Sequence, residues 1–166
     1  MIEKLKSEMI RYYSGDPKRV QHFIKVYFFC EMIGNAESLS DGEMLVLRAA
    51  ALTHDIGIKR AEELYNSASG KYQEELGPEI ARKMLETIGF SQNVIDRVCF
   101  LIANHHTYTD IDSLDYQILV EADFLVNLYE DNCPTDSVKS VKEKIFKTAV
   151  GTKILDEMFL SNFSDK

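Results

Sequence analysis

Residues 40–55 read SDGEMLVLRAAALTHD, and this stretch decides the fold. Ser40 and Glu43 have the spacing of a capping box, in which each side chain pairs with the other residue's backbone N–H at a helix start. Residues 44–53 are mostly apolar, so the helix is predicted to be central. It is predicted to end at His54, and Asp55 follows directly.

The rest of the chain shows the same kind of pattern. Apolar residues recur at intervals of three and four, which is the period of helices and not of strands. Pro17, Pro78 and Pro134 all fall at or near the first turn of a predicted helix, where the missing N–H is tolerated. The sequence therefore predicts an all-α protein in which no proline interrupts a helix. The predicted helices cover residues 2–13, 17–35, 41–54, 59–66, 78–88, 92–105, 115–130, 135–149 and, as a short element, 152–160.

Length and composition narrow the class of protein. A chain of 166 residues and 19.0 kDa has the size of one domain, so residues 1–166 are expected to form one. No apolar run approaches the roughly 18 residues that span a bilayer. The three cysteines form no C-x-x-C pair, so we expect neither a disulfide framework nor a thiolate zinc site, and we predict a cytoplasmic protein without a membrane partner. A net charge of −8 argues against polymeric nucleic acid as a partner, because its phosphates are also negative.

The polar residues at core-facing positions point to a metal site. His22, His54, His105 and His106 are the four histidines of the chain, and each shares a helical stripe with apolar residues. Asp123 lies on a similar stripe, where an ionised carboxylate needs a cation or hydrogen-bond donors. Imidazole and carboxylate groups suit a catalytic divalent ion with open positions. One metal site would account for all of these residues together.

Each of these residues also has an explanation without a metal. His22 alone could be a satisfied core histidine, and His54 could interact with the dipole at a helix C-terminus. Asp123 could pair with a buried arginine or lysine, and His105 with His106 could be a frayed helix end. These explanations must all hold independently, so a single metal site is the simpler interpretation.

The order of the ligand-type residues adds a resemblance to this interpretation. In chain order they are His22, the dipeptide His54-Asp55, the pair His105-His106 and then Asp123. This order resembles the ligand pattern of the HD superfamily of metal-dependent phosphohydrolases. The resemblance covers residues 19–127, and the C-terminal helices of about residues 135–160 follow it.

The resemblance implies a single HD-domain helical bundle with a metal site between core helices. It implies that His22, His54, Asp55 and Asp123 hold one divalent ion. This ligand set suits Mn, Co, Ni, Mg, Fe or Zn, so the identity of the ion stays open.

The number of metal ions depends on one difference from the family pattern. Members with two ions carry a further histidine between the His-Asp pair and the His-His pair. Residues 56–104 contain no histidine, so we predict one ion. A second ion would need Glu74 or Glu75 together with His105 or His106.

The positions of residues beside the ion predict further roles. Asp55 is expected to orient or deprotonate the attacking water in addition to binding the ion. His105 or His106 would be a further ligand or would donate a proton to the leaving oxygen. Arg19 and Lys59 are the cations predicted to meet the phosphate, and each could equally be a solvated surface charge.

These features predict that a metal-activated water hydrolyses a small phosphate ester, with a nucleotide as the favoured substrate. Two other functions stay open. One is a metal-dependent HD module that senses nucleotides without turning them over. The other is a di-iron HD-type oxygenase, which the missing mid-chain histidine disfavours.

The C-terminal segment is expected to be amphipathic and then apolar. Lysines on the predicted helix 135–149 form a face that is expected to meet solvent. The tail that follows is more apolar than a frayed terminus, so we expect it to fold back over the core or, as the second choice, to form a homodimer. Its apolar residues are Ile154, Leu155, Met158, Phe159, Leu160 and Phe163.

Overall fold

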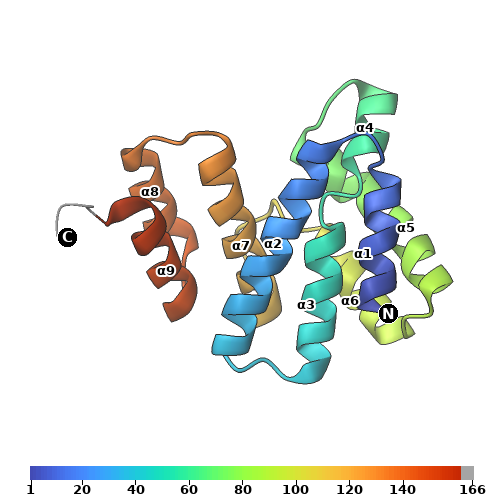
Figure 1. Cartoon of the computed structure of the whole chain (residues 1–166), viewed down its shortest axis with the longest axis horizontal. Helices are drawn as coiled ribbons and strands as arrows, with labels where there is room; N and C mark the ends of the chain where they lie inside the picture. Colours follow the sequence, from blue (N-terminus) through green and yellow to red (C-terminus); the bar gives the residue numbers. More distant parts are fainter. Residues whose placement is uncertain (162–166) are drawn as a thin grey trace.

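The structure is a computed structural model that describes residues 1–161. All regular elements in this range are helices, so the predicted all-α class is confirmed (Figure 1). They are α1 (Ile2–Tyr12), α2 (Pro17–Ala36), α3 (Asp41–Thr53), α4 (Ile58–Tyr65), α5 (Gly70–Ile88), α6 (Gln92–Ile102), α7 (Leu114–Glu130), α8 (Thr135–Ile145), α9 (Ala149–Leu155) and the π-helix η1 (Asp156–Leu160).

Helix α3 forms the centre of the bundle. Its predicted capping box is present, because the Ser40 hydroxyl accepts from the Glu43 N–H and the Glu43 carboxylate accepts from the Ser40 N–H. The helix packs against α1, α2, α6 and α7. Residues 49–52 are buried, since close neighbours surround this helix on several sides.

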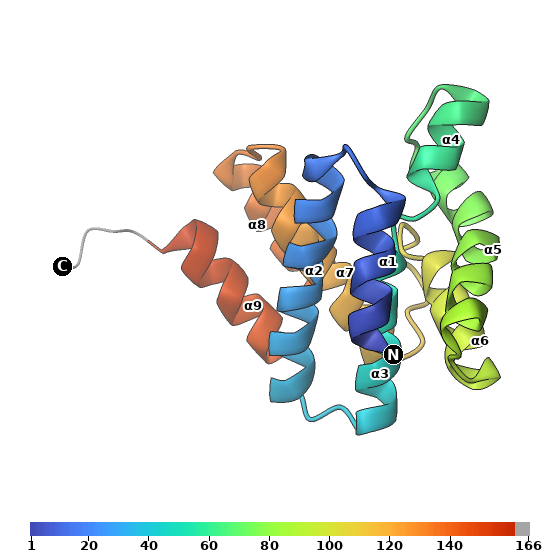
Figure 2. The ribbon, with the colours of Figure 1, turned by 45° about the vertical axis from the view of Figure 1, so that its right-hand side comes forward.

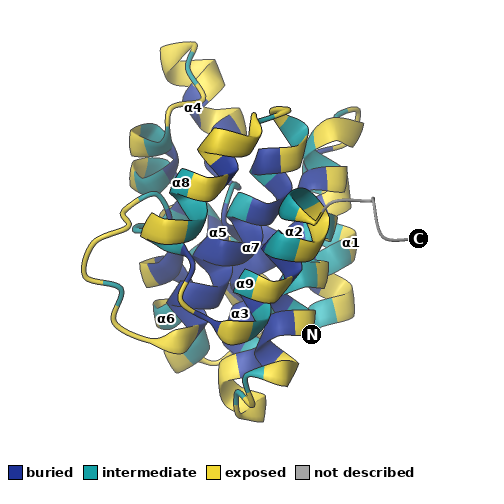
Figure 3. Cartoon of the chain, turned by 90° about the vertical axis from the view of Figure 1, so that its left-hand side faces the viewer, coloured by how far each residue is buried: buried dark blue, intermediate teal, exposed yellow. Residues whose placement is uncertain are grey.

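The other helices form layers around α3. Helices α2 and α7 pack together beside it, and α5 and α6 pack together at one end of the molecule, opposite α8 and α9 (Figures 1 and 2). The buried positions gather along α7 and α3, whereas the exposed positions follow the helix ends and connecting loops (Figure 3). Polar groups on α2, α3 and α7 can therefore meet in the interior.

The start of α5 corrects the sequence prediction. This helix begins at Gly70 instead of Pro78, and Pro78 lies inside it. Its early turns pack closely on the segment before α4: a Cβ on Gly57 would lie 2.9 Å from the backbone nitrogen of Gly77. This close packing stabilises the early turns although the proline removes one main-chain hydrogen bond.

The predicted helix 135–149 also has a wrong end: α8 stops at Ile145, and α9, which begins at Ala149, is a separate helix. Phe146 is extended between them, with φ −75° and ψ 128°. The buried carboxylate of Glu121 accepts the backbone N–H groups of Lys147 and Thr148 at 2.6 Å and 2.9 Å. A helix that continued past Ile145 would take these donors away and leave the buried carboxylate with fewer hydrogen bonds.

The described part of the C-terminal tail folds back onto the core. Ile154 and Leu155 are buried, and Phe159 and Leu160 pack against the same cluster. Phe163 lies outside the described residues, and the predicted homodimer and single-domain division stay predictions. No helix of residues 1–161 is both long enough and apolar enough to cross a bilayer.

Candidate metal centre

The four predicted ligands come together in the core. His22 projects from α2, His54 and Asp55 lie at the C-terminal end of α3, and Asp123 projects from α7. The Nε2 atom of His22 lies 3.2 Å from His54 Nε2, 3.2 Å from an Asp123 oxygen and 3.4 Å from an Asp55 oxygen. His54 Nε2 lies 3.5 Å from Asp55 and 3.6 Å from Asp123. Residues 101 positions apart in sequence thus share one small space.

Hydrogen bonds on the far side of each ring orient the two imidazoles. His54 Nδ1 donates to the Ala51 carbonyl at 3.0 Å, and His22 Nδ1 donates to the Glu130 carboxylate at 3.1 Å. Because Nδ1 carries the proton in the neutral ring, Nε2 is left with a lone pair. Both lone pairs point into the space that also holds the carboxylates of Asp55 and Asp123.

Two buried atoms at this place have no hydrogen-bond partner among the described residues. They are the Oδ1 atom of Asp123 and the Nε2 atom of His105. A buried acceptor without a donor is unfavourable, and a buried carboxylate is more so. A divalent cation would satisfy the lone pairs and balance the negative charges. The donor set therefore fits a metal ion.

The electrostatics also favour a bound cation. Without a bound cation, burial lowers the pKa of His22, but Asp123, Asp55 and Glu130 outweigh this effect and raise the pKa to about 9, so the ring carries a second proton at pH 7 that a metal ion would displace from Nε2. Burial would raise the pKa of Asp55, but the neighbouring imidazoles lower it to about 2. The same imidazoles hold the pKa of Asp123 far below its ordinary value despite its burial. The carboxylates thus stay ionised and attract positive charge.

A second group of potential ligands adjoins the first. It consists of Asp55, His105 and His106. Asp55 belongs to both groups, because its Oδ1 lies 3.5 Å from His105 Nε2 while its Oδ2 faces His22 and His54. The rings of His105 and His106 have their centroids 4.0 Å apart.

The sequence predicted one ion and gave Glu74 or Glu75 as a ligand that a second ion would need, but this second group has a different composition. The Glu74 carboxylate accepts the backbone N–H of His106 at 3.0 Å, and Glu75 is exposed. The amide oxygen of Gln73 instead lies 3.1 Å from His106 Nε2. The group therefore forms without a side chain from Glu74 or Glu75.

Comparison with known proteins identifies the family of the chain. The family model described as HD domain matches residues 19–144. The chain belongs to the HD domain family. No curated protein matches the sequence.

A solved structure is similar to this HD domain protein. It is the crystal structure of a "predicted HD superfamily hydrolase" from an uncultured Thermotogales bacterium, with a TM-score of 0.68 and 24% identity. The match covers 95% of this chain and 84% of that chain. This likeness shows the fold. The family and the His/Asp cluster together support a metal-dependent HD hydrolase in general terms.

Helix α6 of the HD domain ends at Ile102, before the two adjacent histidines, and not at residue 105 as predicted. His105 is buried, and its Nδ1 donates to the Ile102 carbonyl at 2.8 Å, which directs Nε2 toward Asp55. His106 is more exposed and lines the cavity that leads to the site. Burial and the neighbouring His105 lower the pKa of His106 to about 4, so this ring is neutral at pH 7.

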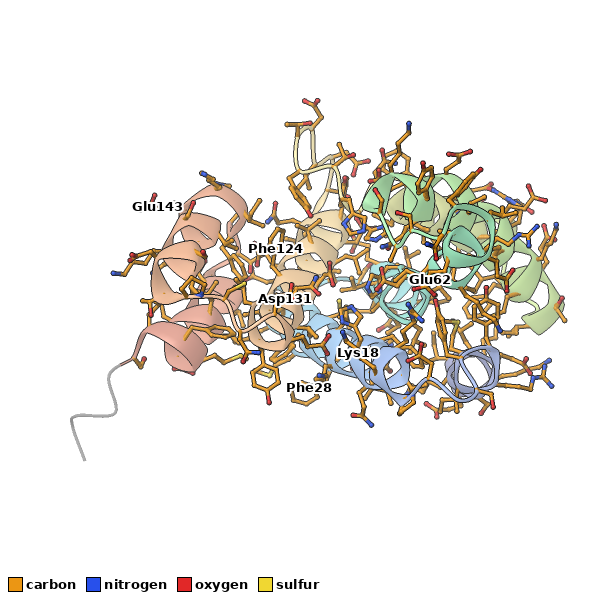
Figure 4. The ribbon with its side chains drawn as sticks, turned by 90° about the horizontal axis from the view of Figure 1, so that it is seen from above. Lys18, Phe28, Glu62, Phe124, Asp131 and Glu143 are labelled. Atoms are coloured by element: carbon orange, nitrogen blue, oxygen red, sulfur yellow. The ribbon has the colours of Figure 1, made fainter. Side chains whose placement is uncertain are left out.

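Four of the potential ligands border a cavity of about 400 Å³; they are His22, Asp55, His106 and Asp123. The cavity is also lined by Lys18 and Arg19 at the start of α2, by Asn127 near the end of α7 and by Asp131 directly after that helix. Lys18 and Asp131 are labelled in Figure 4, which views the ribbon from above. A molecule of about this volume can therefore reach the metal centre from solvent.

The two predicted phosphate-binding cations lie in different places. Arg19 lines the cavity, but its guanidinium already pairs with Asp16 and Glu62. Lys59 is exposed and lies over the ring of Tyr12, away from the residues that line the cavity. The structure thus does not bring Lys59 to the site.

Sequence reasoning missed several residues that support or border the site. Asn127 and Glu130 follow Asp123 by four and seven positions, so helical spacing alone places them on the same face of α7. Gln73 gave no such signal, because the sequence placed it in a loop before the predicted helix 78–88. Lys18 gave none either, since exposed lysines near helix starts are common.

The turn that carries Asp55 is held from α1. The hydroxyl of Tyr13 donates to the backbone carbonyl of Asp55 at 2.7 Å, and that of Tyr12 donates to the carbonyl of Ile56 at 3.2 Å. Gly57 then packs against α5. These contacts fix the backbone that places the Asp55 carboxylate between the two ligand groups.

Proposed function

We propose that this protein is a metal-dependent phosphohydrolase that acts on a small phosphate ester, with a nucleotide as the favoured substrate. The observation that carries this proposal is the cluster of imidazoles and carboxylates at His22, His54, Asp55 and Asp123. The Oδ1 atom of Asp123 and the adjacent Nε2 atom of His105 are buried and have no hydrogen-bond partner among the described residues. This cluster opens to a cavity large enough for a small ester. The HD family supports hydrolysis as the type of reaction.

His22, His54 and Asp123 would hold the ion, and Asp55 would complete its ligands. When bound, a divalent ion stabilises negative charge on a phosphoryl group and makes water more acidic. Asp55 has one oxygen on the side of His22 and His54 and the other on the side of His105. Its carboxylate is thus in place to orient the attacking water and accept its proton.

The cavity wall supplies the contacts that would hold the substrate. Lys18 lines it and forms no ion pair with any described residue, so its ammonium is available to a phosphate. His106 is neutral at pH 7 and would donate or accept a hydrogen bond near the leaving oxygen. Asn127, one turn after Asp123, would offer its amide to the rest of the substrate.

The test is phosphate release from a panel of nucleotides and p-nitrophenyl phosphate, with Mn²⁺, Co²⁺ or Ni²⁺ added to metal-free protein. We expect turnover of at least one ester that requires the metal and falls by at least about a hundredfold in Asp55→Asn. Asp96→Asn is the matched control, because Asp96 is exposed and lies outside both ligand groups.

An inactive wild type with full metal occupancy would contradict the proposal. A nucleotide-sensing module is the second candidate. The Arg19 guanidinium already pairs with two carboxylates, so few cations at the cavity are left to stabilise a phosphoryl transition state. A sensor would bind a nucleotide in the same panel with metal present and release no phosphate. Oxygen consumption by iron-loaded protein would instead indicate an oxygenase.

A further inference from the structure

Helix α2 carries a row of exposed large apolar side chains that the metal centre does not use. Ile24, Phe28 and Met32 follow one another at intervals of four residues, so they form a continuous ridge along the helix. Phe28 is 58% exposed, and Figure 4 shows it at the outer edge of α2. Single exposed apolar residues are ordinary, but a continuous ridge of them is typical of an interaction surface.

The ridge lies between two apolar grooves. The first groove, of about 570 Å³, lies between α1 and α2, with Leu52 of α3 among the residues that line it. The second, of about 410 Å³, lies between α2 and the residues Leu125, Tyr129 and Met158 of α7 and η1. Ile24 and Phe28 border both grooves, so the ridge and the grooves form one surface.

The area of this surface approaches what a stable interface requires. Its large apolar side chains with the greatest exposure are between 42% and 64% exposed; they are Ile10, Ile24, Phe28, Met32, Tyr129 and Met158. If a fully exposed side chain of this size offers about 200 Å², their exposed parts amount to roughly 600 Å². A standard interface buries about 800 Å² on each partner, and the polar rim would supply the rest.

We propose that this face of α2 binds the same face of a second copy of the chain. A two-fold interface brings one patch against itself, so the patch must complement itself. A ridge between two grooves is complementary to itself, because the ridge of each copy can enter a groove of the other copy. The rim carries Lys6, Lys25 and Glu31, so charges of both signs border an apolar centre.

The homodimer is independent of the proposed activity, but its edge lies beside the metal centre. Lys25 borders the second groove and pairs with Glu130 at 2.6 Å, and Glu130 accepts the Nδ1–H of His22. A partner on this face would shield the Lys25–Glu130 ion pair from water.

The test is the molar mass in solution, measured by light scattering and by sedimentation velocity. The protein concentration is about 50 µM, which exceeds the micromolar dissociation constants of the weakest interfaces of this size. We expect twice the chain mass of 19.0 kDa for the wild type. Phe28→Asp, which puts a charge at the centre of the ridge, should raise the dimer dissociation constant at least about thirtyfold.

The matched control is Leu64→Asp, which replaces a 47% exposed side chain on α4, away from the two grooves, and should remain dimeric. Met32→Glu replaces Phe28→Asp if the helix content of the latter falls, because Met32 is exposed and tolerates a polar side chain. A monomeric wild type would overturn the proposal. A dimer that survives a folded ridge variant would overturn it as well, since that dimer would use another face.

Discussion

At the scale of single residues, Glu130 connects the metal centre to the surface of the protein. Its carboxylate accepts from His22 Nδ1 at 3.1 Å and from Lys25 at 2.6 Å. Such a carboxylate fixes the tautomer of a ligand histidine and makes Nε2 a better donor to a metal. Glu130 is thus a positioning residue that acts through His22.

Replacement of Glu130 should therefore weaken metal binding more than it changes the fold. We expect Glu130→Leu to lower the affinity for Mn²⁺ by about tenfold to a hundredfold. Glu130→Gln retains an oxygen that accepts the Nδ1–H, so it should lose less. Calorimetric titration of metal-free protein measures the Mn²⁺ affinity of both variants. Glu31→Gln is the control, because Glu31 lies further along α2 and pairs with Arg48 of α3. Equal affinity in the leucine and wild-type proteins would disprove the role.

The adjacent histidines should differ when each is replaced by alanine. His105 Nε2 is buried without a partner and lies 3.5 Å from Asp55, so we expect His105→Ala to weaken metal retention. His106 lines the cavity and contacts Gln73, so His106→Ala should mainly raise KM or lower kcat while the metal stays bound. Metal content and steady-state kinetics distinguish the two outcomes. If both variants behave like wild type, neither histidine belongs to the site.

At the scale of elements, the crossing of the segment before α4 with α5 places the His-Asp turn. A Cβ on Gly57 would lie 2.8 Å from the backbone oxygen of Gln73 and 2.9 Å from the backbone nitrogen of Gly77. Backbone atoms cannot move aside as a flexible side chain can. The segment before α4 and helix α5 approach this closely because glycine has no side chain at position 57.

Gly57→Ala should therefore destabilise the protein by about 1–3 kcal/mol, the usual range for an overpacked site. The matched control is Gly42→Ala in the first turn of α3, where no atom lies within 4 Å of the added methyl. That substitution should be neutral or should stabilise the protein by up to about 1 kcal/mol, because alanine favours helix more than glycine. Urea denaturation measures both. An unchanged free energy of unfolding for Gly57→Ala would show that α5 can shift.

Two of the helix boundaries that differ from the prediction show what local sequence patterns cannot report. Pro78 predicts a helix start because its missing N–H is tolerated there, yet packing of the preceding turns extends the helix to Gly70. The amphipathic pattern of residues 135–149 continues through a break that Glu121 stabilises from α7. In both places a contact distant in sequence decides the boundary.

At the scale of the whole molecule, the sequence was sufficient to predict the all-α class and the inward placement of the residues in the first group. Periodic apolar faces place His22, His54 and Asp123 inward, and the structure brings them together with Asp55. The cavity wall was not predictable in this way. Arg19 reaches it with its charge already paired and Lys59 does not reach it, because α4 directs Lys59 toward Tyr12. These placements depend on how whole helices cross.

The central claim is that these converging side chains hold a divalent ion, and metal content tests it most directly. The measurement is elemental analysis of protein purified without added metal, for the wild type and Asp55→Ala side by side. Asp55 contributes an oxygen to both ligand groups, so its loss affects one ion or two alike. We predict at least about one ion per chain in the wild type and a nearly metal-free variant with unchanged helix content. Equal metal content in the two folded proteins would contradict the account.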